Sequence, residues 1–593
     1  TGTSVTYAGG GGGGGLPGGT AVTGAGAGGS FIAGGLSTSG GNATANTGSG
    51  GGGGIGNTGS AYTVGGAGAS GLVVVRYLGS SAGTGGNLRS GTGTANGYTL
   101  HTFTGTGAST LTLNAISSTF SGRISGSGGL SVNAAGGTLM LSGNNSYTGN
   151  TAINSGKVIT SHVNALGNNS AVTLSNISGV LLQLNSSLNI GSLTGGGSTG
   201  GNLVLGTGAV LTAGSDNTSS TFGGAISGAG GLAKSGTGTW TLTSNGTYTG
   251  ATTVNAGALV LSNNAPTTAS ASFGGAGSLR IESVGTGFTG AFSTSGWTFA
   301  NTLGGLTVGK TTNTSAVSLY DATIAGPITA YGGTVNVNGN LNTTAAATLG
   351  DVLLKSSGDI SLATTKSITT NGGDVVLWSN SDNQTSTGSI MLYGGSSITT
   401  GGGHLWMAGG ADSATQWHGL TVGDGYAVSG TTISGTGNAA NFDKVGVFLE
   451  EATLSTSGGD IYMRGKTTTF RGFLATGTVD VNAGSGKIYI EGQAVSDGGG
   501  AGIGWHHSTT TAYRNGIFTL TSSNAASDAI TWISDASQSV GTGLVSNGAG
   551  EGAGMAGTTS LVTTGGGGIS FTSLGSSTKA GAYGVRLAYL TTQ

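Results

Sequence analysis

This chain of 593 residues is poor in several residue types at once: it has no cysteine, only three prolines and 6% charged residues. So few prolines exclude a collagen-like chain, in which proline recurs throughout. No apolar run reaches about 18 residues, so no helix is expected to span a membrane. With a net charge of −2, the chain lacks the basic surface that nucleic-acid binding requires. The absence of cysteine is common among exported bacterial proteins but does not by itself fix a compartment.

Glycine is the residue in excess. The 130 glycines are about three times the usual share, and chains of this composition are often disordered. However, 35% of the residues are hydrophobic, and they fall in short alternating runs bounded by Gly, Asn and Ser. Such runs are typical of half-buried strands joined by turns. No capped stretch with helical periodicity stands out, so the sequence predicts an all-β protein.

One stretch occurs twice, at residues 118–159 and 220–260. Phe120 and Leu130 of the first copy match Phe222 and Leu232 of the second, each 102 positions later. One copy is too small to bury its own apolar face, so it must stack on a neighbouring unit. We therefore expect these four residues to lie in the core of a repeat structure, with about five rungs of roughly 20 residues between the copies.

The two copies resemble the passenger-associated β-strand repeat of autotransporters. They share its glycine-spaced pattern, including the Y-x-G-x-T segment that begins at Tyr147 and at Tyr248. The second copy keeps the lysine of the pattern as Lys234, whereas the first has Val132 near that place. The resemblance covers the two copies alone and implies an extracellular parallel β-solenoid. It carries no catalytic residue.

The first 104 residues are the most glycine-rich part, with unbroken glycine runs at 9–15 and 50–54. Ordering such a run costs about 1–2 kcal/mol per residue, so we expect extended glycine strands packed side by side, within the subunit or against another. Residues 71–77 (GLVVVRY) and 97–103 (GYTLHTF) follow. This arrangement resembles the bacterial and phage glycine-rich domain, which implies no chemistry.

A second repeat begins after residue 351. Glycines recur at an equal spacing at positions 358, 373, 388 and 403, each followed by apolar residues in alternation such as Ile360 and Leu377. A second repeat with twice this spacing overlies the first. One rung of the solenoid can therefore take either one glycine spacing or two. This part resembles the repeats of filamentous-haemagglutinin-type adhesins. We predict a glycine-rich domain at 1–104, autotransporter-like solenoid repeats at 105–300 and haemagglutinin-like repeats at 301–593, with Ile360 and Leu377 in the core.

No catalytic, cofactor or metal site is predicted. Neighbouring strand residues point to opposite faces, so Glu450 and Glu451 are not expected to face one substrate. The carboxylates of Asp359 and Asp374 fit surface turns in neighbouring rungs. His506–His507 lacks a nearby cysteine or third histidine that would complete a metal site.

Insertions interrupt the second repeat at about 408–450 and 495–550, and loops on one face of a solenoid are often where binding occurs. Trp417, Trp505 and Tyr462 are the candidate contact residues. We favour packing or subunit contacts for these rings, with stacking on sugar rings as the alternative.

The sequence thus predicts an extracellular, non-catalytic structural protein that assembles with itself into a surface fibre or sheath. Residues 1–320 carry seven basic and two acidic side chains, and residues 321–593 carry ten and seventeen, which favours head-to-tail contact between copies. The alternative is an adhesin that binds glycans or surfaces through its loops, and a minor alternative is a polysaccharide-degrading β-helix. No signal peptide stands at Thr1, so we expect a mature or trimmed chain.

Overall fold

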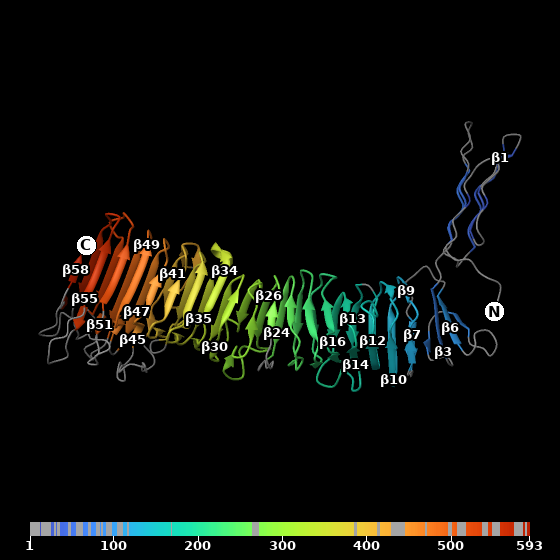
Figure 1. Ribbon diagram of the computed structural model, residues 1–593, viewed down its shortest axis with the longest axis horizontal. Helices are drawn as coiled ribbons and strands as arrows, with labels where there is room; N and C mark the ends of the chain where they lie inside the picture. Colours follow the sequence, from blue (N-terminus) through green and yellow to red (C-terminus); the bar gives the residue numbers. More distant parts are fainter. Residues whose placement is uncertain are drawn as a thin grey trace. The chain divides into compact units, whose positions relative to one another are not determined.

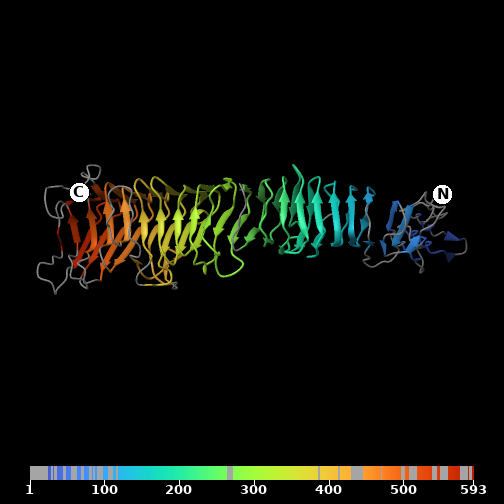
Figure 2. The ribbon, with the colours of Figure 1, turned by 90° about the horizontal axis from the view of Figure 1, so that it is seen from below.

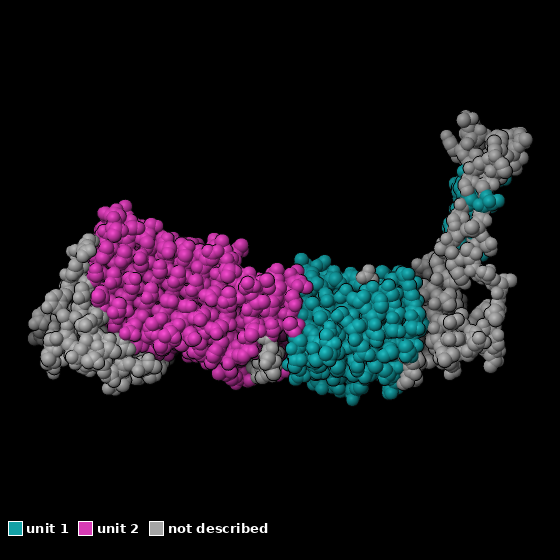
Figure 3. Space-filling model, in the orientation of Figure 1, with its two compact units in different colours: residues 1–240, 246–250 teal, residues 241–245, 251–593 magenta. Residues whose placement is uncertain are grey.

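The computed structural model describes residues 12, 20, 25–28, 31–32, 36–44, 49–54, 63–68, 73–78, 83–84, 87–89, 98–103, 111–114, 118–167, 169–263, 272–384, 388–411, 415–428, 445–468, 471–495, 501–506, 517–536, 544–547, 558–574, 585–586 and 590–592. These residues form two compact units, one of residues 1–240 and 246–250 and the other of residues 241–245 and 251–593 (Figure 3). Both units are made of strands (Figure 1).

The N-terminal part of unit 1 contains short antiparallel sheets. The strands formed by the GLVVVRY and GYTLHTF segments pair with each other, with Val75 opposite His101. The strands of this part are β1 (Phe31–Ile32), β2 (Leu36–Ser37), β3 (Val73–Leu78), β4 (Gly83–Thr84), β5 (Asn87–Arg89), β6 (Tyr98–Phe103) and β7 (Leu111–Asn114). The resemblance of residues 1–104 to a bacterial glycine-rich domain stays a prediction.

Four glycine-rich segments, residues 25–28, 40–44, 49–54 and 63–68, are joined by backbone hydrogen bonds; we call them the glycine bundle. Gly52 donates its N–H to the Gly41 carbonyl and accepts the N–H of Gly66, at 2.9 and 2.8 Å. A β-carbon on Gly52 would lie 1.9 Å from the carbonyl oxygen of Ala27. At Gly52 the segments therefore approach so closely that only glycine fits, and the hydrogen-bond partners of Gly52 lie within the same chain.

The rest of unit 1 is a stack of parallel strands. Leu130 pairs with Thr151, and Thr151 pairs with Val172, so each rung is close to the length expected from the two sequence copies. The strands are β8 (Ser118–Phe120), β9 (Ser125–Gly126), β10 (Leu130–Leu141), β11 (Ser146–Tyr147), β12 (Thr151–Thr160), β13 (Ala171–Leu174), β14 (Leu181–Leu184), β15 (Leu188–Ile190), β16 (Ser192–Gly195), β17 (Asn202–Leu205), β18 (Val210–Ala213), β19 (Ser220–Phe222), β20 (Ile226–Gly228) and β21 (Gly231–Lys234), followed by β22 (Thr239–Leu242) at the unit boundary.

Unit 2 is a parallel β-helix with three sheets that the chain visits in turn (Figure 1 and Figure 2). Sheet 1 holds β24 (Ala258–Ser262), β26 (Ser278–Glu282), β29 (Gly305–Val308), β32 (Ile328–Gly332), β35 (Val352–Ser356), β38 (Val375–Ser379), β41 (Leu405–Gly409), β44 (Ala427–Val428), β47 (Ile461–Thr467), β50 (Ile488–Ala494), β53 (Ile530–Asp535) and β56 (Ile569–Leu574).

Sheet 2 holds β27 (Phe292–Ser293), β30 (Val317–Leu319), β33 (Val335–Val337), β36 (Ile360–Leu362), β39 (Ile390–Leu392), β45 (Val445–Glu450), β48 (Arg471–Thr476), β51 (Ala501–His506), β54 (Leu544–Asn547) and β57 (Val585–Arg586). Sheet 3 holds β31 (Ala322–Ile324), β34 (Leu341–Ala346), β37 (Ser367–Asn371), β40 (Ser397–Thr399), β46 (Thr453–Ser455), β49 (Val479–Gly484), β52 (Ile517–Ser522), β55 (Thr558–Thr563) and β58 (Leu590–Thr592). The remaining strands of this unit are β23 (Thr252–Val254), β25 (Ser272–Gly274), β28 (Thr298–Phe299), β42 (Gln416–Trp417) and β43 (Leu420–Thr421).

The rung of the second repeat takes two of the glycine spacings. Ile360 pairs with Ile390 in sheet 2, and Val375 pairs with Leu405 in sheet 1. The shorter spacing arises because the same glycine-and-apolar pattern opens a strand in two different sheets of each rung. The choice that the sequence left open between one spacing and two is thereby settled.

The interior of each unit is filled by the alternate, inward-facing residues of the strands. The six residues expected in the repeat core, Phe120, Leu130, Phe222, Leu232, Ile360 and Leu377, are all buried, with at most 7% of their surface exposed. The only helical segment in the described ranges is the 3-10 turn η1 (Ala347–Gly350). None of these ranges forms a helix with the length and apolar composition that crossing a bilayer takes. The predicted all-β solenoid is confirmed.

Candidate functional site

One stretch of the outer surface of sheet 1 is covered by an excursion of the chain, residues 410–411 and 415–428, which contains the hairpin β42–β43. We call the covered surface of β38, β41, β47 and β50, together with this excursion, the loop-capped face. The indole N–H of Trp378 donates to the carbonyl of Gly410 at 2.9 Å. Trp378, Trp406 and Val422 are buried in one apolar cluster although the first two point out of the solenoid. The excursion therefore supplies the partner that an outer apolar surface needs.

A polar clasp fixes the far end of the excursion. Glu491 accepts hydrogen bonds from Arg464 Nε at 2.8 Å, from the Tyr489 hydroxyl at 2.7 Å and from the Tyr426 hydroxyl. Arg464 also lies over the ring of Tyr426, 4.0 Å from its centroid, and donates to the Asp424 carbonyl. Burial, together with the bond to Glu491, raises the pKa of Tyr426 to about 12. The phenol thus stays protonated and donates to the carboxylate at neutral pH.

Successive rungs stack their aromatic side chains on this face. The column in register runs Leu353, Val376, Trp406, Tyr462, Tyr489, Thr531 and Ser570. The rings of Tyr462 and Tyr489 are 4.7 Å apart between centroids and 7° from parallel. Trp406 is nearly parallel to Tyr462 at 6.5 Å. We call the three stacked rings of Trp406, Tyr462 and Tyr489 the aromatic column.

Two of the three candidate contact residues meet here. Trp417 in β42 lies 5.8 Å from Tyr462 in β47 between ring centroids, and both rings pack on the buried cluster beneath. Both are half-buried. Trp505 is in β51 of sheet 2, opposite Ala475, and its side chain lies outside the described part of the structure.

Tyr489, Arg464 and Glu491 were missed at the level of sequence. For Tyr489 a signal existed: the segments Gly459-Asp-Ile-Tyr-Met and Gly486-Lys-Ile-Tyr-Ile place Tyr462 and Tyr489 at the same repeat position. Equal repeat positions in a solenoid lie one above the other, so the ring stack follows from the alignment.

Three further side chains, His404, His418 and Asp460, bring possible metal-ligand atoms within 4.8 Å of one another. The two imidazole rings are stacked 3.9 Å apart and 11° from parallel. His404 Nδ1 accepts the backbone N–H of Asp460, and His418 Nε2 lies 2.8 Å from Asp460 Oδ2. Burial and the adjacent His418 lower the pKa of His404. Because lone pairs lie in the ring planes, parallel imidazoles do not converge on one ion, and the arrangement suits a hydrogen-bonded knot that holds the excursion.

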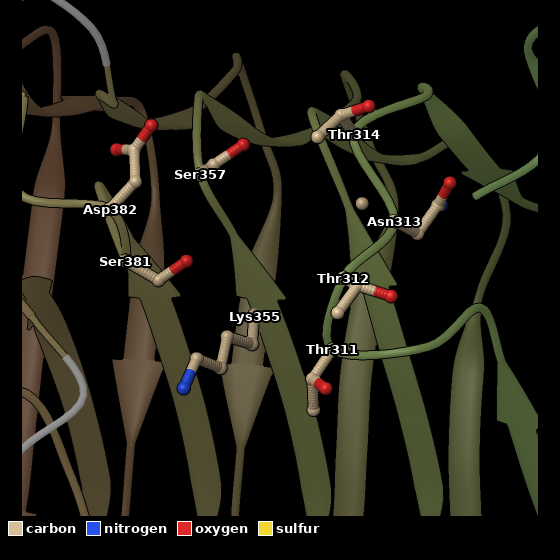
Figure 4. A pocket seen from close by; sticks show the side chains of 9 residues that line it. Thr311, Thr312, Asn313, Thr314, Lys355, Ser357, Ser381 and Asp382 are labelled. Atoms are coloured by element: carbon tan, nitrogen blue, oxygen red, sulfur yellow. The ribbon is translucent and has the colours of Figure 1, made fainter. Parts of the chain in front are cut away.

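A separate pocket of about 350 Å³ opens in unit 2 (Figure 4). Its lining is polar and comprises Thr311, Thr312, Asn313, Thr314, Gly332, Lys355, Ser357, Ser381 and Asp382. Asn313 is buried and its amide bonds backbone groups of Phe288, Ser315 and Tyr331. Lys355 Nζ lies 3.7 Å from the ring centroid of Trp378. The pocket offers hydroxyl groups but no apolar ring, so it is the weaker candidate for holding an organic ligand.

Glu450 and Glu451 lie closer together than strand alternation predicts, although they do not face one substrate. β45 ends at Glu450, and Glu451 has a φ of 48°. This turn brings a carboxylate oxygen of each residue to within 3.6–3.7 Å of the place where a β-carbon on Gly394 would stand. Glu450 is nevertheless only 1% exposed and accepts the N–H of Gly394, so it supports the backbone of the neighbouring rung.

Asp359 and Asp374 do not form a stacked pair either. Asp359 precedes β36 of sheet 2 and accepts the N–H groups of Gly388 and Ser389, whereas Asp374 precedes β38 of sheet 1. The two residues hold the same position in the sequence repeat. Because one repeat is half a rung, they lie in different sheets and not one above the other. The side chain of His506, in β51, and the whole of His507 lie outside the described residues.

Comparison with known proteins identifies the repeats. The family model of the Passenger-associated-transport-repeat matches residues 136–159 and 232–261. The first match covers the end of β10, β11 and most of β12, and the second runs from β21 to β24. The resemblance of the two sequence copies to this repeat is confirmed.

A stretch of 194 residues, 31% of the chain, is 37% identical to the Adhesin BmaC autotransporter of Brucella suis biovar 1 (strain 1330). The matched stretch spans 6% of that relative's length. No solved structure matches the chain.

Proposed function

This chain is a parallel β-solenoid that carries autotransporter passenger repeats, and from this premise we propose that it serves as a surface-exposed, non-catalytic adhesion segment. The observation that carries the proposal is the loop-capped face, because there, in the described part of unit 2, the chain builds a specific apolar and polar surface outside its own core. The similarity to an autotransporter adhesin supports the same function. The solenoid then acts as the rigid support of that surface.

The adhesive function is tested with the full chain coupled to beads at equal density. Attachment to epithelial monolayers and to surfaces coated with extracellular-matrix material is counted under flow. We expect attachment several-fold above that of albumin-coated beads. Attachment no higher than that of the albumin beads on both kinds of surface would refute adhesion.

The non-catalytic part of the proposal rests on Glu450. A glycosidase needs two carboxyl groups that both reach the substrate, whereas Glu450 is buried and bonded to the backbone of Gly394. Incubation of the full chain with plant and bacterial polysaccharides should release no reducing ends. Release that disappears in Glu450→Gln or Glu451→Gln would show that the pair is catalytic.

A second candidate function is self-association into a head-to-tail fibre, which the uneven charge of residues 1–320 and 321–593 favours. The glycine bundle satisfies its interior within the chain, so contact with a second copy would use its exposed residues, such as Asn42 and Ala67. Sedimentation velocity over a range of concentrations tests this. We expect polymers from the full chain and monomers after deletion of residues 1–85; a monomeric full chain would reject self-association.

A further inference from the structure

The aromatic column ends at β50, before the last two described strands of sheet 1, β53 and β56. Trp406, Tyr462 and Tyr489 stack in three successive rungs, and the residue in register after Tyr489 is Thr531. The next one is Ser570, which is exposed. Within the described part of the chain, no second ring contacts Tyr489. One face of this half-buried ring is therefore covered by Tyr462, and the other looks over a small side chain. We call this place the step at Thr531.

We propose that the step at Thr531 binds one pyranose ring of a neutral polysaccharide, stacked on the open face of Tyr489. Rungs are about 4.8 Å apart, and the stacked tyrosines are 4.7 Å apart between centroids. The rung of Thr531 thus leaves room for one ring in the place where the column would otherwise hold another aromatic side chain. The C–H face of a pyranose is apolar and its hydrogens carry partial positive charge, which suits the electron-rich face of tyrosine.

The tyrosine is held rigidly before any ligand arrives. Its hydroxyl donates to Glu491 Oε2 at 2.7 Å, and Arg464 holds the same carboxylate at 2.8 Å. A ring fixed on one face by Tyr462 and at its tip by Glu491 loses little freedom on binding, which favours affinity.

The surroundings of the step supply groups that suit sugar hydroxyls. Lys487 Nζ and Asp528 pair at 2.8 Å at one edge, with 39% and 54% of their side chains exposed. Gln493 Nε2 donates to Asp535 at 3.3 Å at the other edge. The carboxylates of Glu491, Asp528 and Asp535 are matched by the cations of Arg464, Lys466 and Lys487, with Lys466 in register beside Gln493. A surface without net positive charge does not attract uronic or sialic acids, so the ligand class is a neutral hexose or N-acetylhexosamine polymer.

This inference rests on the proposed adhesive function and names a ligand class for it. It is tested by saturation-transfer NMR and fluorescence titration of the full chain with cellohexaose and chitohexaose, and with a hyaluronan hexasaccharide as the acidic probe. We expect at least one neutral probe to bind and the acidic probe to bind more weakly.

Four variants locate the site. Thr531→Trp fills the step and Tyr489→Leu removes the ring, so each should weaken binding by about tenfold or more. Tyr489→Phe keeps the ring but loses the bond to Glu491, so it should bind more weakly than the parent and more tightly than Tyr489→Leu. The matched control is Thr519→Trp, on the outer surface of β52 in sheet 3, which should bind as the parent does. Circular dichroism checks that each variant is folded, and Tyr489→Leu decides the matter where Thr531→Trp does not fold.

The proposal is overturned when neither neutral probe binds, when the folded Thr531→Trp or Tyr489→Leu variant binds as tightly as the parent, or when the acidic probe binds most tightly. Failure of the adhesion assay on beads is a separate result. A chain that adheres but binds none of the neutral probes refutes only the step at Thr531, whereas a chain that does not adhere refutes the adhesive function.

Discussion

Asp351 and Asp374 are linked from one rung to the next: Oδ1 of Asp351 accepts the backbone N–H of Asp374 at 2.9 Å. The link repeats along the same edge of sheet 1, since Asp374 Oδ1 accepts the N–H of His404 and Asp460 Oδ1 accepts that of Lys487. The side chain before each strand therefore holds the start of the strand above it. Because two carboxylates follow one another, this edge is sensitive to charge.

The first prediction concerns pH. Burial, together with the charge of Asp374, raises the pKa of Asp351 to about 6. The folded state therefore binds a proton that the unfolded state releases near pH 4, and stability falls as pH rises from about 4 to about 6. Asp351→Asn keeps the acceptor oxygen without the charge. At pH 7.5 it should be more stable than the parent by on the order of 1 kcal/mol, since the site is half exposed.

Urea unfolding of parent and variant between pH 3.5 and 7.5 measures this effect. Asp321→Asn is the control. Oδ1 of Asp321 accepts the backbone N–H of Asn340 at 2.7 Å, as Asp351 does for Asp374, but the residue that donates is an asparagine and carries no charge. A parent whose stability does not fall across this window, or an equal gain in the control, would contradict the repulsion between Asp351 and Asp374.

The second prediction concerns the polar clasp. Glu491→Gln removes the charge that holds Arg464 and weakens the acceptor for Tyr426. Both partners of the ion pair are largely buried, so we expect a local loss of about 1–3 kcal/mol in residues 415–428. Amide hydrogen exchange of that segment should speed up while β36 and β37 stay protected. Glu282→Gln, whose partner Arg280 is 46% exposed, should change stability by less than about 0.5 kcal/mol.

The third prediction concerns the core. Leu377 is 1% exposed inside β38, and Leu377→Asp buries an unpaired carboxylate at a cost of several kcal/mol. Thr399→Asp, at the half-buried end of β40, should cost little. Thermal unfolding followed by circular dichroism compares the two. Equal losses of stability would mean that the inward face of the rung is misassigned.

The fourth prediction concerns the glycine bundle. A methyl group on Gly52 would lie 1.9 Å from a backbone oxygen, whereas one on Gly68 has its nearest neighbour at 3.6 Å. Gly52→Ala should therefore destabilise the bundle by about 1–3 kcal/mol, and Gly68→Ala should leave it intact. Limited proteolysis of residues 20–70 separates the variants. Similar cleavage in both would contradict the close packing.

Much of the fold follows from the sequence because local patterns dictate it. Alternation buries Ile360 and Leu377, and the repeat register places Tyr462 beside Tyr489. The rung length did not follow, because equal patterns open strands in two sheets and only pairing such as Ile360 with Ile390 distinguishes them.

The candidate site was foreseen only in part. Trp417 and Tyr462 were singled out, but their meeting depends on the excursion folding back over strands that lie far from it in the sequence, through contacts such as that of His418 with Asp460. The positive φ of Glu451 depends on its surroundings and has no signal in the pair of glutamates itself. Long-range packing, rather than strand propensity, decides such features.

The most direct test of adhesion through the loop-capped face is attachment of a non-adherent bacterial strain that displays the full chain. Cells with the parent chain, with Trp417→Ala combined with Tyr489→Leu, or with Thr519→Trp are compared under flow at equal surface levels. We predict that the parent and Thr519→Trp attach several-fold above the undecorated strain and that the double variant falls to its level. Equal attachment by the double variant and the parent would contradict a role of this face in adhesion.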